Sequence, residues 1–136
     1  MNIAVVRAEF NEQYTAEMLE AAETKIKEDE DAELHDTVEV PGVHEIPLAA
    51  AKQLRREDVH GVVALGAVIE GATDHDQVIA RNVSKQLIEL SCEEEKPVGY
   101  GVIGPGVSWA QVEQRTEQYA EEAVEAVLET AAVDET

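Results

Sequence analysis

The chain has 136 residues, 44% of them hydrophobic, which is enough for one folded domain whose core needs neither disulfide nor metal. Its 30 acidic and 10 basic residues give a net charge of −20, which argues against nucleic acid or an anionic membrane as partner. The single cysteine excludes an intrachain disulfide and a cysteine-based zinc site, and no apolar run approaches the ~20 residues of a membrane span.

Hydrophobic periodicity predicts strands that alternate with amphipathic helices along the whole chain. The predicted strands cover residues 2–6, 34–40, 61–66 and 97–103, and the predicted helices cover 15–28, 44–56, 74–93 and 108–130. This βαβαβαβα order predicts a four-stranded parallel sheet with right-handed crossovers and helices on both faces. We therefore expect an α/β fold, a single three-layer αβα domain over residues 1–136.

Ligands of such sheets bind beyond the carboxyl ends of the strands. Four segments follow the predicted strands, at residues 7–11, 41–45, 67–75 and 104–106. The chemically distinctive residues of the chain fall in or near these segments. We therefore expect a functional site at this edge of the sheet.

A glycine-containing turn opens the third predicted helix. Free backbone N–H groups at a helix start attract anions, so this turn is a candidate anion site. An ordinary capped helix explains the same residues, with Thr73 as N-cap and Asp74 and Asp76 in the first turn. His75 in that turn is either a proton shuttle near neutral pH or an exposed histidine at a helix start.

Three further residues each allow two interpretations. Phe10, the only phenylalanine, is either a ring that stacks on a flat ligand or a plug in the core. Glu45 either accepts hydrogen bonds from a polyol or is a favourable acid at a helix start. Arg115, the only cation after Lys96, is either an ion-pair partner of nearby acids or a phosphate clamp.

Four segments, in this order and spacing, are together far more specific than any one alone. They are residues 8–11 (AEFN), 40–49 (VPGVHEIPLA), 65–76 (LGAVIEGATDHD) and 97–106 (PVGYGVIGPG). The chain resembles lumazine synthase (6,7-dimethyl-8-ribityllumazine synthase) of the archaeal type from about Asn2 to Leu128. That family has a flavodoxin-like fold. It joins 5-amino-6-(D-ribitylamino)uracil to 3,4-dihydroxy-2-butanone 4-phosphate in riboflavin biosynthesis, releasing water and phosphate without cofactor or metal.

The resemblance implies a role for each candidate residue. The pyrimidine and its ribityl chain would contact Phe10, Asn11, Val43, His44, Glu45, Val68, Ile69 and, from a neighbouring subunit, Tyr100. The phosphate would be bound by Gly71, Ala72, Thr73 and the neighbour's Arg115. His75 would transfer protons. His44 stands where the family commonly has an aromatic residue, and the spacing from Gly104 to Arg115 is slightly longer than in bacterial members.

The resemblance also implies a homo-oligomer, namely a pentamer with sites between neighbouring subunits. Many family members assemble twelve pentamers into a hollow shell. Riboflavin synthase is a further candidate partner. Two alternatives stay open: the archaeal-type riboflavin synthase paralog, which needs no phosphate site, and a non-catalytic flavin- or lumazine-binding shell protein.

The setting of the protein follows from its composition. A lone cysteine and a strand-like run that starts at Asn2, leaving no room for a signal peptide, predict a cytoplasmic protein. The acidic residues, concentrated on presumed helix surfaces, resemble the surface bias of proteins from salt-loaded cytoplasms, so we expect a halophilic source.

Overall fold

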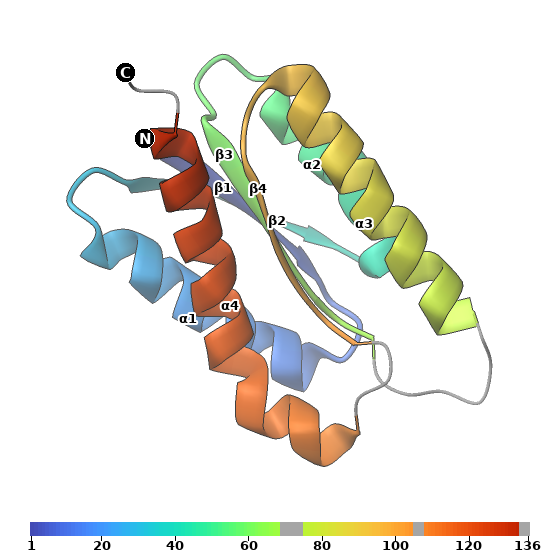
Figure 1. Cartoon of the computed structure of the whole chain (residues 1–136). Helices are drawn as coiled ribbons and strands as arrows, with labels where there is room; N and C mark the ends of the chain where they lie inside the picture. The colour runs from blue at the N-terminus through green and yellow to red at the C-terminus, as the bar shows by residue number, and fades with distance from the viewer. Residues whose placement is uncertain (69–74, 105–107, 134–136) are drawn as a thin grey trace.

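A computed structural model of the chain describes residues 1–68, 75–104 and 108–133. Strands and helices alternate along it as predicted, and Figure 1 shows the sheet between two layers of helices. The elements are β1 (Asn2–Ala8), α1 (Glu12–Glu28), β2 (Glu33–Val40), the 3₁₀ helix η1 (Val43–Glu45), α2 (Ile46–Leu54), β3 (Gly61–Ala67), α3 (His75–Glu94), β4 (Val98–Ile103) and α4 (Trp109–Ala132).

The four strands form one sheet in the order β2-β1-β3-β4, and every neighbouring pair is parallel. The register aligns the carboxyl ends of the strands, since Ala8 lies opposite Val40 and Ala67 lies opposite Ile103. The segments that follow the strands therefore begin at one edge of the sheet. This confirms the predicted α/β architecture.

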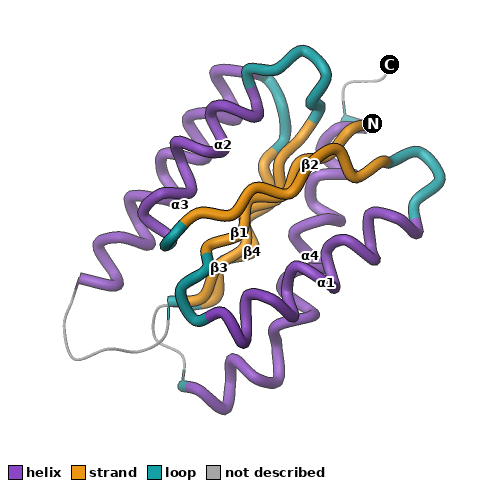
Figure 2. Tube along the Cα trace, turned by 180° about the vertical axis from the view of Figure 1, so that it is seen from behind, coloured by secondary structure: helices purple, strands orange, loops and turns teal. Residues whose placement is uncertain are grey.

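Helices α1 and α4 cover one face of the sheet, and α2 and α3 cover the other (Figure 2). Alternate strand residues serve the two cores: Ile3 and Val5 pack with α1 and α4, whereas Ala4 and Val6 pack with α2 and α3. Strand β3 is buried along its whole length, which explains why it reads as a continuous apolar run. None of the helices in the described part of the chain combines the length and the apolar character needed to cross a membrane.

Glycines allow α4 to lie directly against β3 and β4. A Cβ atom added at Gly99 would overlap the backbone carbonyl oxygen of Ala123. A Cβ added at Gly61 would lie 2.7 Å from Cγ1 of Val127, closer than real side chains approach. The backbone of α4 therefore packs at a distance that only strands without side chains permit at these positions.

Two predicted boundaries are wrong: the end of β1 and the start of α1. Arg7 and Ala8 were expected in a loop, yet both belong to β1 and are buried. A charged residue is tolerated there because Nη2 of Arg7 pairs with Oε2 of Glu39 at 2.9 Å. Helix α1 begins at Glu12 and not at residue 15, because Asn11 turns the chain directly into the helix.

Two further predicted helices differ from the structure only at their ends or in their subdivision. The helix expected over residues 44–56 is divided into η1 and α2, and Pro47 lies in the first turn of α2, where its missing N–H costs no hydrogen bond. Helix α4 starts after Ser108, whose hydroxyl accepts a hydrogen bond from the backbone N–H of Gln111, while the Gln111 side chain accepts one from the backbone of Ser108. This capping box is legible in the sequence as Ser-x-x-Gln.

The close packing of α4 makes Gly99 sensitive to any side chain. Gly99→Ala should lower the free energy of unfolding by about 1–3 kcal/mol or more, because the new methyl group meets a backbone atom that cannot rotate away. The closest contact of a Cβ at Gly61 is with the side chain of Val127, so Val127→Ala should compensate for part of the effect of Gly61→Ala. Urea denaturation of the single and double variants measures both effects. Rescue of Gly99→Ala by Ala123→Gly would contradict the assignment to the backbone.

Candidate active site

Backbone hydrogen bonds fix the start of the segments that follow the strands. The N–H of Phe10, after β1, donates to the carbonyl oxygen of Pro41, after β2, at 3.0 Å. The N–H of Val68, after β3, donates to the carbonyl oxygen of Ile103, at the end of β4, at 2.7 Å. The strand ends are thus joined beyond the ladder proper, and the residues on them have defined positions.

Asn11 lies at the sharp turn between β1 and α1. Its backbone is left-handed, with φ 64° and ψ 45°, a conformation that asparagine adopts more readily than most residues. Although Asn11 is the N-cap residue of α1, its side chain makes no cap hydrogen bond. Instead its Nδ2 donates to the carbonyl oxygen of Ala67 at 2.9 Å. Asn11 therefore ties the start of α1 to the end of β3.

Phe10 is 71% exposed, so its interpretation as a core plug is wrong. Its ring lies at the carboxyl edge without being needed to fill the core. The other interpretation, a ring that stacks on a flat ligand, stays a prediction.

The segment after β2 divides its residues between core and solvent. Val43 is buried against β3, where a Cβ added at Gly66 would lie 2.8 Å from Val43 Cγ2. His44 and Glu45 are exposed, and a Cβ added at Gly42 would lie 3.3 Å from Oε2 of Glu45. Glu45 precedes α2 without forming a side-chain cap, so its carboxylate remains accessible to a hydroxyl-bearing ligand.

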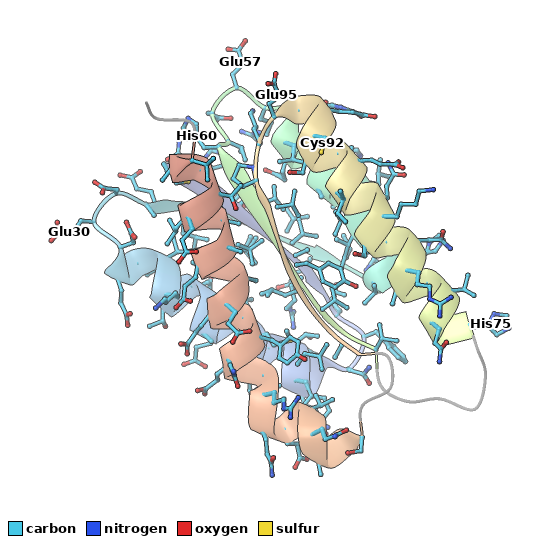
Figure 3. All side chains as sticks on the ribbon, in the orientation of Figure 1. Glu30, Glu57, His60, His75, Cys92 and Glu95 are labelled. Atoms are coloured by element: carbon cyan, nitrogen blue, oxygen red, sulfur yellow. The ribbon has the colours of Figure 1, made fainter. Side chains whose placement is uncertain are left out.

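The predicted anion site is described only in part. Ile69, Gly71, Ala72 and Thr73 lie outside the described residues. Val68, just before them, is buried in the same core cluster as Val43. His75 is the first residue of α3 and is exposed, and Figure 3 shows it at the end of that helix, away from the sheet.

Tyr100 lies apart from the other candidates. It pairs with Ala64 on β3 and stands three residues before the end of β4 at Ile103. At the rise of a parallel strand this is roughly 10 Å from the carboxyl edge. Its hydroxyl donates to the carbonyl oxygen of Ala80 at 3.5 Å, and burial raises the pKa of the phenol, which stays protonated at neutral pH.

Arg115 is exposed on α4, on the face of the sheet opposite to the helix that carries His75. Among the described residues no carboxylate forms an ion pair with it, although acids surround it in the sequence. The structure therefore does not support the ion-pair interpretation. A single chain places the two predicted phosphate and proton-transfer groups on opposite layers.

A groove of about 570 Å³ runs between α3 and the outer edge of β4. Tyr100 lines it together with Arg81, Lys85 and Ile88, whose side chain is 62% exposed. A second hollow continues from it along the same two elements to Cys92, an exposed free thiol. Arg81 and Lys85, two of the chain's ten basic residues, thus flank an apolar groove. The hydrophobic periodicity of α3 did not predict this groove.

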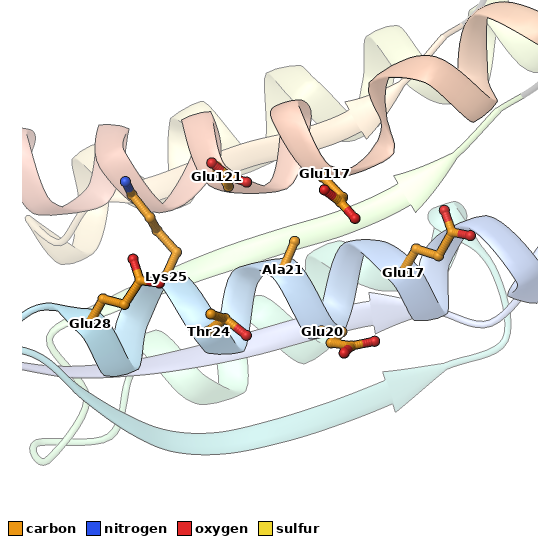
Figure 4. A pocket seen from close by; sticks show the side chains of 8 residues that line it. All are labelled: Glu17, Glu20, Ala21, Thr24, Lys25, Glu28, Glu117 and Glu121. Carbon is orange, nitrogen blue, oxygen red and sulfur yellow. The ribbon is translucent and has the colours of Figure 1, made fainter.

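A second groove, of about 280 Å³, lies between α1 and α4 (Figure 4). It is lined by Glu17, Glu20, Ala21, Thr24, Lys25, Glu28, Glu117 and Glu121. Five glutamates against one lysine repel an anionic ligand. No three histidine, cysteine or acidic side chains within residues 1–68, 75–104 and 108–133 are arranged as metal ligands.

The sequence model of the family described as 6,7-dimethyl-8-ribityllumazine synthase matches residues 1–135. The chain belongs to this family. Proteins named 6,7-dimethyl-8-ribityllumazine synthase are similar to it over most of their length. That of Methanobrevibacter smithii is 44% identical over 127 residues, 93% of this chain and 91% of the relative. That of Staphylothermus marinus is 46% identical over 125 residues, 92% and 83% respectively. That of Halobacterium salinarum is 44% identical over 118 residues, 87% and 88%.

Membership of the lumazine synthase family confirms the resemblance carried by the four sequence segments. The sequence pointed to Asn11 as a binding residue but gave no sign of its bond to Ala67, because that bond joins residues far apart in the chain. The left-handed turn had one available signal, an asparagine directly before a helical pattern.

Asn11 combines a left-handed backbone with a side-chain hydrogen bond, and this combination predicts an order of stability among its variants. Asn11→Ala should lower the free energy of unfolding by about 2–3 kcal/mol, because it loses a hydrogen bond and strains the left-handed turn. Asn11→Gly keeps the turn relaxed and should lose only about 1 kcal/mol. Urea denaturation gives the comparison. Equal stabilities of the two variants would show that the backbone conformation contributes nothing.

Proposed function

We propose that this protein condenses 5-amino-6-(D-ribitylamino)uracil with 3,4-dihydroxy-2-butanone 4-phosphate to 6,7-dimethyl-8-ribityllumazine, releasing phosphate and water. It is then a transferase of riboflavin biosynthesis. The observation that carries the proposal is the family match over residues 1–135. The exposed Phe10 ring at the carboxyl edge of the sheet supports it, because the pyrimidine is a flat ring that needs a stacking partner.

The pyrimidine side of the site is built from the ends of β1, β2 and β3. Phe10 stacks on the ring, and Asn11 and Glu45 bind the ribityl hydroxyls. The neighbouring Val43, His44, Val68 and Ile69 line the pocket. Asn11 retains its Oδ1 as an acceptor while its Nδ2 is bound to Ala67.

The chemistry needs positioning more than a nucleophilic side chain. The pyrimidine amine attacks the ketone, and a first water leaves to give an imine. Phosphate is then eliminated, the ribitylamino nitrogen attacks the remaining carbonyl group, and a second water leaves as the ring closes. Holding the two reactants together supplies much of the acceleration. His75 moves protons, and Gly71, Ala72, Thr73 and Arg115 stabilise the departing phosphate.

We further propose that Tyr100 and Arg115 act in the site of a neighbouring subunit of a pentamer, either a free pentamer or one of twelve in a shell. Within one chain Tyr100 lies roughly 10 Å from the carboxyl edge, and Arg115 belongs to the layer opposite His75. Among the described strands β4 pairs with β3 alone, so its outer side is available for pairing with a second chain. Riboflavin synthase, which consumes lumazine, is the further partner that this function implies.

We also propose that the protein works in a salt-rich cytoplasm. The net charge of −20 and the acidic groove between α1 and α4 support this proposal. The similarity to the relative from Halobacterium salinarum agrees with it.

One assay separates the proposed reaction from its alternatives. The protein is given the aminopyrimidine with butanone phosphate, or lumazine alone, and product absorbance and inorganic phosphate are followed against a blank without protein. Lumazine with equimolar phosphate supports the proposal. Riboflavin formed from lumazine alone indicates the paralogous synthase, and binding without turnover indicates a shell protein; either contradicts it.

A site shared between subunits predicts recovery of activity in mixed assemblies. His75→Ala should reduce kcat by roughly 10–10⁴-fold, the range of general acid–base catalysis. Arg115→Ala should raise KM for the butanone phosphate much more than KM for the pyrimidine. Subunits of the two variants, unfolded and refolded together, should regain activity because some sites then combine an intact His75 with an intact Arg115. Activity no higher than that of either parent would contradict the shared site.

The charge of the subunit predicts that assembly depends on salt. Repulsion between surface carboxylates acts over ~10 Å at 0.1 M salt but only ~3 Å at 1 M, whereas apolar contacts between subunits persist. Light scattering across a salt series should therefore show larger and more stable assemblies as salt rises. Activity measured in parallel should persist, because short hydrogen bonds to phosphate survive screening. An assembly equally stable at ~0.1 M and ~2 M salt would contradict the repulsion argument.

A further inference from the structure

Among the described residues, Arg7 is the only buried residue that carries a charge, and 4% of its surface is exposed. Its Nη2 lies 2.9 Å from Oε2 of Glu39, and its Nη1 donates to Oγ1 of Thr15 at 3.4 Å. Its Nε has no partner among the described residues. A guanidinium has five N–H donors, so these contacts leave it incompletely satisfied in a place where desolvation is costly. Such a group calls for a reason other than packing.

The position of Arg7 supplies that reason. Arg7 is the penultimate residue of β1, and Glu39 is its register partner on β2. Thr15 lies in the first turn of α1. The guanidinium therefore joins two strands and a helix start on either side of the turn formed by Glu9, Phe10 and Asn11, which connects β1 to α1.

Hydrogen bonds to neighbouring elements hold that turn. Three residues connect β1 to α1, and one of them, Asn11, has a positive φ. The backbone N–H groups of Glu9 and Phe10 donate to carbonyl oxygens at and just after the end of β2 at 2.8 and 3.0 Å, and Nδ2 of Asn11 donates to the carbonyl oxygen of Ala67. The position of the turn therefore follows the position of the strands and the helix start to which it is bonded. The exposed Phe10 ring contributes no core packing of its own. The direction in which Phe10 and Asn11 face a ligand then depends on how firmly β1, β2 and α1 are held together.

We propose that Arg7 is a positioning residue for the pyrimidine substrate: held by Glu39, it sets the place of the Phe10–Asn11 turn. This inference rests on the proposed function. Arg7 touches no substrate and acts only through the turn. Arg7 is buried but its partner Glu39 is exposed, so an apolar side chain at position 7 removes the cost of desolvating the guanidinium and leaves the Glu39 carboxylate in water. Arg7→Met should therefore leave the unfolding midpoint nearly unchanged while substrate binding suffers.

The test compares Arg7→Met with the wild-type protein. KM for the aminopyrimidine should rise roughly 10- to 100-fold, since small misplacements of binding groups have effects of that size. Its Kd, from a fluorescence titration without the second substrate, should rise in parallel. At saturating pyrimidine, kcat and KM for butanone phosphate should stay within about twofold, because His75 and the phosphate groups are not moved.

A matched control removes an ion pair at the far end of α1 from the turn. Lys25, in the last turn of that helix, pairs with Glu125 of α4 at 3.1 Å. Lys25→Met should leave KM and Kd for the pyrimidine unchanged. If it raised them as much as Arg7→Met, or if Arg7→Met lowered the unfolding midpoint and affected both substrates alike, Arg7 would be a structural residue and the inference would be overturned.

Two variants keep the test decisive if Arg7→Met does not fold. Arg7→Lys retains the charge and Glu39→Gln retains a hydrogen-bonding group, so both preserve most of the buried environment. A raised Kd for pyrimidine with kcat unchanged supports the inference in either variant, and an unchanged Kd in both overturns it. A wild-type protein that neither binds pyrimidine nor forms lumazine contradicts the proposed function itself, whereas an active wild type with unaffected variants contradicts only the role of Arg7.

Discussion

Parallel pairing of the strands is the constraint on which the candidate site depends. Strands that all run in one direction must each be followed by a helix that returns the chain, so every strand-to-helix turn lies at the same edge. The register then sets the ends level, with Ala8 opposite Val40 and Ala67 opposite Ile103. Residues as distant in the chain as Phe10 and Val68 share this edge because hydrogen bonding between strands permits no other arrangement.

The fold could be predicted from the sequence where one local pattern decided the outcome. Strand β3 reads as a strand because covered faces make it apolar throughout. The end of β1 could not be predicted, because Arg7 breaks the apolar run and its partner Glu39 lies on another strand. The start of α1 was missed for a similar reason, since Asn11 adopts its turn with support from Ala67. Local periodicity contains neither of these distant contacts.

The candidate site shows the same division. The motif segments indicated which residues to consider, but they left open whether Phe10 lay in the core, and only its exposure decides that question. Within a single chain, Tyr100 and Arg115 do not lie beside the other candidate residues. The layers of the fold separate Arg115 from His75, and the strand rise separates Tyr100 from the edge. Their partners depend on a second copy, which neither a sequence pattern nor one chain contains.

The pairing of α1 with α4 across one face of the sheet has a consequence for synthesis on the ribosome. Met18, Ala22 and Ile26 of α1 share a core cluster with Val124 and Val127 of α4, the helix translated last among those described. Until α4 leaves the exit tunnel, this half of the core lacks one of its two covering helices, and the nascent chain exposes part of an apolar layer to its neighbours on a polysome. The acidic residues of α1 flank that layer, so like-charge repulsion opposes contact between adjacent nascent chains while translation finishes.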